Sequence, residues 1–192
     1  MKYNGSMLAL VVVLLVCMVQ VVGVAAETNL VVNGSFEEEW TVVSADTPEK
    51  LRTVGWTANV LHHDELGPAP DKVDGRSALR MVSTTRRNAQ FLNSVSIAVD
   101  GGKTYKFSYW LYMKDGITSI AVVNNTAGAF IRETQMRHFA DDYMPGEWQY
   151  FEFVFTLPET CEAIRVSLSQ SPLTENERTE YYLDDVRIVQ LD

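Results

Sequence analysis

Lys103 to Met113, KTYKFSYWLYM, is the stretch that decides the fold. Its residues alternate in character along the chain. One face carries Tyr105, Phe107, Tyr109, Leu111 and Met113, and the other carries Lys106, Ser108, Trp110 and Tyr112. A period of two is typical of a β-strand that buries one face. Asp100-Gly101-Gly102 before this stretch and Lys114-Asp115-Gly116 after it are turn sequences, so we predict a strand bounded by tight turns.

The same pattern recurs on both sides of this strand. Further strands are predicted over 54–61, 77–83, 94–99, 117–123, 129–136, 148–157, 163–169 and 181–191. Asn124-Asn125-Thr126-Ala127-Gly128 is predicted to join two of them as a hairpin loop. No segment has a convincing helical period. Short strands between Gly, Asn and Pro residues favour an all-β fold, an antiparallel β-sandwich of the jelly-roll type, in a single domain over 27–192.

Composition narrows the choice of partners. The chain has 192 residues, of which 46% are hydrophobic and 21% charged, as in ordinary globular proteins. It has 16 Lys and Arg residues and 25 Asp and Glu residues, so the formal net charge is -9. A negative surface repels phosphate backbones. We therefore expect no nucleic-acid partner.

The first 26 residues are predicted to be a signal peptide. An apolar run from Met7 to Val24 follows Lys2 and ends at Ala25-Ala26, the small residues that signal peptidase requires. The run is also close to the length of about 18 residues that can span a membrane, so a retained anchor is the alternative. Cleavage after Ala26 leaves a secreted, extracellular protein that no longer contacts the membrane. Cys161 is then its single cysteine, which excludes an intramolecular disulfide.

Several short motifs occur in a recognisable order along the chain. They are Asn33-Gly34-Ser35-Phe36-Glu37, Gly55-Trp56, the 102–110 stretch, Gly146-Glu147-Trp148, Phe153 to Pro158, and Tyr182 to Ile188. This order resembles the CenC-type carbohydrate-binding modules, which include families 4, 9 and 22. The resemblance implies a galactose-binding-like β-sandwich that binds a polysaccharide or oligosaccharide without catalysis.

A metal site is predicted where the two ends of the domain meet. A period of two on the last strand places Asp184 on the core side with Tyr182, Val186 and Ile188. An ionised carboxylate in that position needs hydrogen bonds or a cation, and both remain open on chemistry alone. The resemblance implies a structural calcium ion held by the side chains of Glu37 and Asp184 and by backbone carbonyls.

Carbohydrate-binding residues are expected on the outward face of one sheet or in its edge loops. Aromatic rings cover the apolar patches of pyranose rings, and polar groups bond the hydroxyls. Trp110 and Tyr112 are the first candidates, because they lie opposite the apolar row of their strand. The resemblance adds a polar loop with Arg86, Gln90 and Phe91. Arg132 and His138 are predicted to line the same concave sheet. We leave Trp56 and Trp148 out, as core or rim residues.

Two other classes of function remain to be compared with this one. A jelly-roll hydrolase or lyase needs paired carboxylates or a nucleophile with its base, and none of the motifs sought for such chemistry occurs. A protein-interaction or cell-surface structural module would use Trp110 and Tyr112 as a contact patch. We predict a non-catalytic module that binds a xylan or a β-glucan. It would act alone or with a catalytic or surface-complex partner protein.

Overall fold

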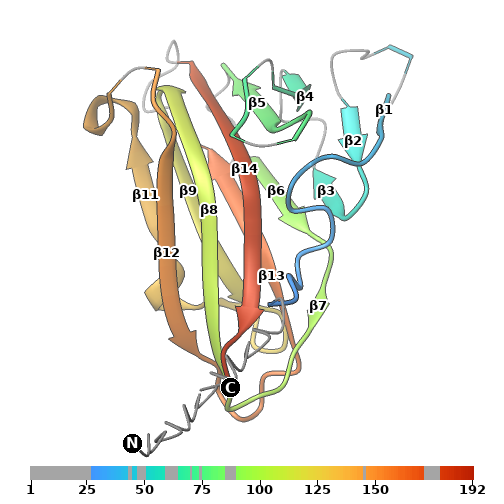
Figure 1. The fold of residues 1–192 in the computed structure, drawn as a ribbon, viewed down its shortest axis with the longest axis vertical. Helices are drawn as coiled ribbons and strands as arrows, with labels where there is room; N and C mark the ends of the chain where they lie inside the picture. The colour runs from blue at the N-terminus through green and yellow to red at the C-terminus, as the bar shows by residue number, and fades with distance from the viewer. Residues whose placement is uncertain are drawn as a thin grey trace, which may run out of the picture.

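A computed structural model describes residues 27–42, 45–46, 51–58, 65–69, 71–73, 75–84, 90–144, 146–170 and 178–192. The predicted signal peptide lies outside these residues. Two antiparallel sheets pack face to face in the described part of the chain, as Figure 1 shows. The predicted antiparallel β-sandwich is therefore confirmed. No described helix has the length and apolar character to cross a membrane.

The first sheet has five strands in the order β12-β8-β14-β5-β4. Their bounds are Gln149–Thr156 for β12, Thr104–Asp115 for β8, Thr179–Gln190 for β14, Leu79–Ser83 for β5 and Glu65–Pro68 for β4. In Figure 1, β12, β8 and β14 lie in front of the other sheet. The outer face of this sheet is therefore turned to the viewer.

The second sheet has seven strands and follows the path β10-β9-β13-β6-β3, with β11 paired to β9 and β7 paired to β13. Their bounds are Ala129–Phe130 for β10, Ile117–Asn124 for β9, Ala163–Gln170 for β13, Gln90–Ser94 for β6, Trp56–Ala58 for β3, Met136–Phe139 for β11 and Ile97–Ala98 for β7. A separate pair joins β1, Trp40–Val42, to β2, Leu51–Thr53.

The core lies between the sheets and matches the predicted apolar row of β8. Tyr105, Phe107 and Tyr109 are each 0% exposed, and Ile164, Val166 and Leu168 of β13 are also fully buried. Most of the predicted strands are present with bounds close to those expected. The strand predicted over 129–136 is wrong, because a 3-10 turn at Arg132–Thr134 separates β10 from β11. β6 also begins at Gln90, inside the predicted loop.

A β-bulge in β14 changes which side chains face the core. The register against β8 shifts between Asp184 and Arg187, and Asp185 has a φ of 44°. Tyr182 and Asp184 therefore pair with Tyr112 and Trp110 and point away from the core. The predicted inward position of Asp184 and Tyr182 is wrong, because the strict period of two does not continue through a bulge.

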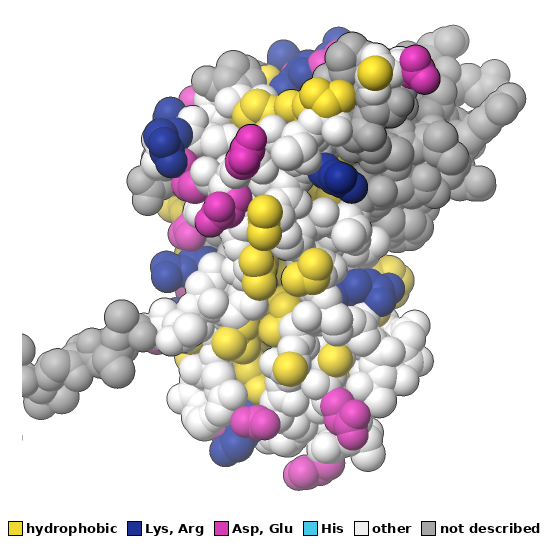
Figure 2. Space-filling view, turned by 90° about the vertical axis from the view of Figure 1, so that its right-hand side faces the viewer, with side chains coloured by type: hydrophobic (Ala, Val, Ile, Leu, Met, Phe, Trp, Pro, Cys, Tyr) yellow, Lys and Arg dark blue, Asp and Glu magenta, His cyan; other side chains and the backbone are white. Residues whose placement is uncertain are grey.

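The N-terminal segment forms backbone hydrogen bonds with the C-terminal half of β14. The backbone N–H of Leu30 donates to Ile188, and Val186 donates to Gly34. A Cβ on Gly34 would lie 1.9 Å from the Val186 carbonyl oxygen, so this close approach requires glycine. Figure 2 looks at the neighbouring edge of the sandwich, where hydrophobic side chains run in a strip between acidic and basic ones.

Candidate functional site

The predicted carbohydrate-binding residues do not meet on one face. Trp110 and Tyr112 lie on the outer side of the five-stranded sheet, whereas Gln90 and Phe91 begin β6 in the other sheet. Arg132 is exposed in the 3-10 turn that follows β10. Arg86 lies outside the described residues. The expectation of one site on the outward face of one sheet and its edge loops is therefore not met, because the described candidates are divided between the two sheets.

His138 occupies the interior rather than either face. It is 0% exposed, and its Nε2 and Nδ1 lie 2.8 Å and 2.6 Å from the hydroxyls of Tyr109 and Tyr143. Burial lowers the pKa of this imidazole to about 4, so it is neutral at physiological pH. Its ring lies against Tyr109 and Phe151 in the interior and not on an outer face of either sheet, so we remove His138 from the candidate residues.

The outward side chains of the seven-stranded sheet are mostly polar, and we call this surface the polar face. Register places them in rows across the strands, since directly paired residues share a side of the sheet. The middle row is Ala121, Ser167, Asn93 and Thr57, and the rows beside it are Arg137, Ser119 and Ser169 on one side and Phe130, Val123 and Arg165 on the other.

The centre of the polar face is lower than its rim. Ala121 is 2% exposed and Ser167 is 4% exposed, although both point away from the core. A small outward side chain is buried only where its surroundings stand above it. Longer side chains surround this centre, and one of them, Phe130, is 49% exposed. An extended chain that crossed the strands would contact the small residues between these longer side chains.

Polar atoms on this face keep capacity for hydrogen bonds. Within the described residues, the buried atoms Asn93 Oδ1 and Arg165 Nε have no hydrogen-bond partner. Arg165 also donates from Nη1 to Asn125 Oδ1. One acceptor and one donor therefore stand beside a row of serine hydroxyls, a combination that suits a ligand rich in hydroxyl groups.

The five-stranded sheet carries an aromatic face made of Trp110, Tyr112, Trp148, Tyr150 and Tyr182. Its rings contact one another. Tyr112 stacks on Tyr182 with centroids 5.1 Å apart and meets the edge of Trp148 at 5.7 Å. Trp110 lies 5.1 Å from Tyr150, which is 47% exposed. The sequence identified two of these rings. Cross-strand pairing brings Tyr150 and Tyr182 to them, and Trp148 joins from the residue before β12.

A charged cluster borders the aromatic face at the start of β14. The carboxylate of Glu180 is 2% exposed and accepts from Arg80 at 3.0 Å, Lys114 at 3.2 Å and Arg178 at 2.8 Å. Arg80 also pairs with Glu65. Burial acts to raise the pKa of Glu180, but the hydrogen bonds from Arg80 and Lys114 and the nearby positive charges outweigh it, and the pKa is lowered.

The two residues predicted to hold a metal line one cavity. Ser35, Glu37, Gly75, Asp184 and Asp185 surround about 210 Å³. Glu37 Oε1 accepts from the backbone N–H groups of Arg76 and Ser77 at 2.6 and 2.9 Å. A Cβ on Gly75 would lie 2.2 Å from this oxygen, so glycine lets the loop approach the carboxylate.

The oxygen groups in this cavity suit a hard cation such as calcium. Asp184 is 1% exposed and accepts from the N–H groups of Val73 and Asp185 at 3.0 and 2.7 Å. Across the described ranges, no group of three or more His, Cys, Asp or Glu side chains is placed to hold a metal ion. Glu37 and Asp184 therefore offer two carboxylates to a cation in this cavity, short of a set of three.

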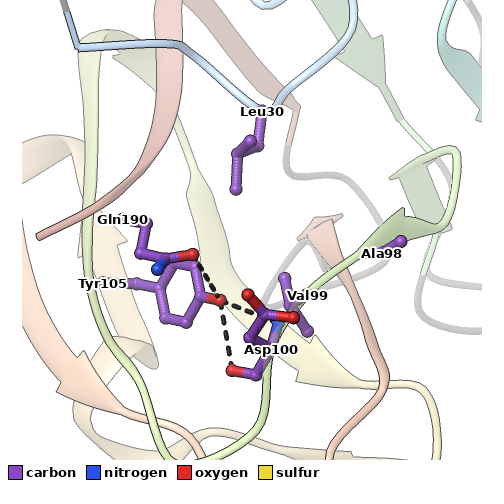
Figure 3. A pocket seen from close by; sticks show the side chains of 6 residues that line it. All are labelled: Leu30, Ala98, Val99, Asp100, Tyr105 and Gln190. Atoms are coloured by element: carbon purple, nitrogen blue, oxygen red, sulfur yellow. Dashed lines mark hydrogen bonds between the residues drawn. The ribbon is translucent and has the colours of Figure 1, made fainter. Parts of the chain in front are cut away.

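A further cavity, of about 190 Å³, opens where the two ends of the domain meet, and Figure 3 shows its lining. The hydroxyl of Tyr105 accepts from the Asp100 N–H at 3.0 Å and lies 3.2 Å from both the Asp100 carbonyl and Gln190 Oε1. The phenol group is thus engaged within the protein. These hydrogen bonds hold the start of β8 in place, and the cavity is not a candidate site.

Part of the polar face could be predicted from the sequence. The predicted strand over 163–169 alternates apolar Ile164, Val166 and Leu168 with polar Arg165, Ser167 and Ser169, and this alternation alone marks an outward polar row. The contribution of Asn93 could not be predicted in this way, because Asn93 falls between the predicted loop that ends at Phe91 and the strand predicted from Ser94.

Comparison with known proteins identifies the family. The chain matches the family model described as "Carbohydrate binding domain" over residues 28–173. No curated protein matches it significantly.

Solved structures share the fold. One described as "CBM4 structure and function" has 18% identity and a TM-score of 0.54, and the match covers 84% of this chain and 99% of that one. The CBM22-1 xylan-binding domain from Paenibacillus barcinonensis Xyn10C has 14% identity and a TM-score of 0.51, with 83% and 92% covered. The bacteriophage CBA120 tailspike protein 4 enzymatically active domain has 14% identity and a TM-score of 0.53. That match covers 85% of this chain, which spans 21% of the tailspike chain.

These matches and the sandwich agree with the resemblance seen in the sequence motifs. The family model covers well over half of the chain, and the domain family is non-catalytic. The protein belongs to the carbohydrate-binding domain family of the CenC type.

Proposed function

We propose that the protein binds a β-linked polysaccharide of the xylan or β-glucan class, and that the chain of sugars lies across the strands on the polar face. Membership of a carbohydrate-binding family supports the ligand class. The observation that carries the location is the burial of Ala121 and Ser167, two small side chains that point outward from the sheet. They mark a low centre, beside which Asn93 Oδ1 and Arg165 Nε stand without partners among the described residues.

The binding chemistry follows from this geometry. Serine hydroxyls, the Asn93 carbonyl and the guanidinium groups exchange hydrogen bonds with sugar hydroxyls, and Phe130 offers an apolar surface at the rim. An open and hydrated face gains little beyond the cost of ordering the ligand. We expect dissociation constants on the order of micromolar to millimolar for a single site.

Affinity electrophoresis tests this proposal. The purified protein runs in native gels that contain neutral xylan, β-glucan, a cellulose derivative or mannan. We expect one of the first two to retard it, and the Asn93→Ala Arg165→Ala variant to migrate as in a gel without polysaccharide. The Trp110→Ala Tyr112→Ala variant, on the opposite face, serves as the matched control and is expected to remain retarded.

Two outcomes contradict the proposal in different ways. Loss of retardation in the Trp110→Ala Tyr112→Ala variant alone moves the site to the aromatic face and leaves the function in place. A folded wild-type protein that no gel retards removes the polysaccharide function itself.

We also propose a structural calcium ion at Glu37 and Asp184. Their convergence on one oxygen-lined cavity supports it. When bound, the ion would neutralise carboxylates from the N-terminal segment and from β14. Calcium at about 100 times its dissociation constant adds about 2.7 kcal/mol to the free energy of unfolding, which raises the melting temperature of a domain of this size by about 5–10 °C. Thermal melts with calcium and with a chelator check this, and equal melting temperatures would reject the ion.

Secretion is part of the same proposal. The apolar run from Met7 to Val24 followed by Ala25-Ala26 supports export and cleavage. N-terminal sequencing of the protein recovered from the culture medium of an expressing host checks it, with Glu27 as the expected first residue.

A further inference from the structure

The aromatic face has an uneven distribution of charge that the proposed function does not use. At the Glu180 end, the side chains in contact are the cations Arg80, Lys114 and Arg178 and the carboxylates Glu180 and Glu65. Cations therefore outnumber carboxylates by three to two in these pairs. The whole chain has the opposite sign, with a formal net charge of -9.

The other end of the same face has the reverse balance. Lys106 pairs with Glu27 at 3.3 Å and with Glu152 at 4.0 Å, so one cation meets two carboxylates. Trp110 and Tyr112 lie on β8 between Lys106 and Lys114. An anionic group beside these rings would therefore be favoured at the Glu180 end over the Lys106 end.

Two cations of the cluster keep donors that face solvent. The side chains of Lys114 and Arg178 are 51% and 44% exposed, and each contacts the buried Glu180 carboxylate. An ammonium group has three N–H donors and a guanidinium group has five, so contact with Glu180 leaves donors on both. Glu180 is itself occupied, because its Oε1 also accepts from the Tyr182 hydroxyl at 3.2 Å. Asp115, which follows Lys114, forms no ion pair among the described pairs.

A row of side chains joins this cluster to the rings. Register places Arg80, Tyr182 and Tyr112 side by side across β5, β14 and β8, and Trp148 meets Tyr112 edge-on at 5.7 Å. Rings that present an apolar surface beside fixed cations suit a sugar that carries a carboxylate, since the ring binds the pyranose and the cations bind the charge.

We propose that the aromatic face is a second glycan-binding surface, separate from the polar face, and that it binds uronate residues of an acidic polysaccharide. The carboxylate contacts Lys114 and Arg178, while the sugar ring lies against Tyr112 and Trp148. This inference rests on the proposed function in one respect, that the ligand is a polysaccharide. It does not depend on where neutral sugars bind.

Binding of a matched pair of polymers tests the inference. The probes are a xylan that carries glucuronate side groups and the same xylan after chemical reduction of its carboxyl groups. In titrations of the wild-type protein at low salt, we expect about tenfold tighter binding of the uronate polymer. We expect this difference to shrink toward unity as sodium chloride rises to about 0.5 M, because salt screens exposed charges.

Variants locate the effect on the aromatic face. Lys114→Gln Arg178→Gln is expected to bind both polymers equally, and Lys114→Arg Arg178→Lys, which keeps both charges, to retain at least half of the preference. The Asn93→Ala Arg165→Ala variant is expected to weaken binding of the reduced polymer and keep the preference for uronate. The wild-type salt series needs no variant, so a folding defect in the glutamine variant leaves the test intact.

The outcomes separate the two proposals. Equal binding of both polymers by the wild-type protein overturns the uronate inference, and so does a preference that survives in Lys114→Gln Arg178→Gln. Unchanged binding of the reduced polymer by Asn93→Ala Arg165→Ala overturns the polar-face site and leaves the uronate inference standing.

Discussion

His138 shows how one residue couples the core to pH. Its imidazole contacts the hydroxyls of Tyr109 and Tyr143 and packs edge-on against Phe151 with centroids 4.6 Å apart. The neutral form is favoured in the folded state, where burial lowers the pKa to about 4, while an exposed histidine in the unfolded chain has a pKa of about 6.5. The stability that this difference confers is present above pH 6.5 and is lost as the pH falls to about 4.

This coupling predicts a specific pH dependence of stability. Between pH 7 and pH 5 the unfolded state takes up a proton that the folded state does not, so the free energy of unfolding should fall by about 2 kcal/mol. Urea denaturation at the two pH values measures it. A His138→Gln variant lacks the titrating group and should show less than about 0.5 kcal/mol of change over this range. A wild-type protein equally stable at both values would contradict the assignment.

At the scale of elements, the contact between the N-terminal segment and β14 depends on Gly34. The Val186 N–H donates to the Gly34 carbonyl at 2.8 Å, and Asn29 bonds both Val186 and Ile188 through its side chain. This pairing brings Glu37 to the bulge at Asp184 and Asp185. The segment therefore builds the proposed calcium site and covers the edge of β14.

Substitution at Gly34 should separate this segment from β14. In Gly34→Ala the new Cβ would lie 1.9 Å from a backbone oxygen, which the sheet cannot move without breaking hydrogen bonds, so we expect a loss of at least about 2 kcal/mol. Gly67→Ala is the matched control, because its Cβ meets only the Leu51 side chain at 3.4 Å or more. Thermal denaturation of both variants checks the difference. Equal melting temperatures would show that the segment does not depend on this contact.

The elements also show what the sequence could and could not predict. β8 was predictable because eleven consecutive residues alternate between turn sequences, and its inward row is the one expected. The bulge at Asp185 was not, because a single residue with positive φ leaves no periodic trace. β6 was missed for another reason. Its first residues, Gln90 and Phe91, were assigned to a polar loop and the next strand was predicted only from Ser94, although Leu92 and Ser94 both face the core.

The same distinction applies to the candidate sites. Trp110 and Tyr112 were predictable as outward side chains of β8, whereas their neighbours Tyr150 and Tyr182 join them through pairing of strands far apart in the sequence. Cross-strand register also decides that β6 lies in the opposite sheet from these rings. Local patterns therefore identified side chains that face solvent, but they did not identify which sheet each one belongs to.

At the scale of the whole molecule, the sandwich presents two outer faces with different chemistry. The polar face has small residues at its centre, and the aromatic face has five rings bordered by charges. One core holds both faces, so they point in opposite directions. The two proposed surfaces therefore place neutral sugars on one side of the molecule and acidic sugars on the other.

The central claim is that a polysaccharide lies across the polar face. A matched pair of bulky substitutions tests it most directly: Ser169→Tyr places a ring on that face, and Glu152→Tyr places the same ring at an outward position of the opposite sheet. Titration with the neutral polysaccharide that retards the protein should show at least tenfold weaker binding for Ser169→Tyr and a change below twofold for Glu152→Tyr. Unchanged binding by a folded Ser169→Tyr variant would contradict the account.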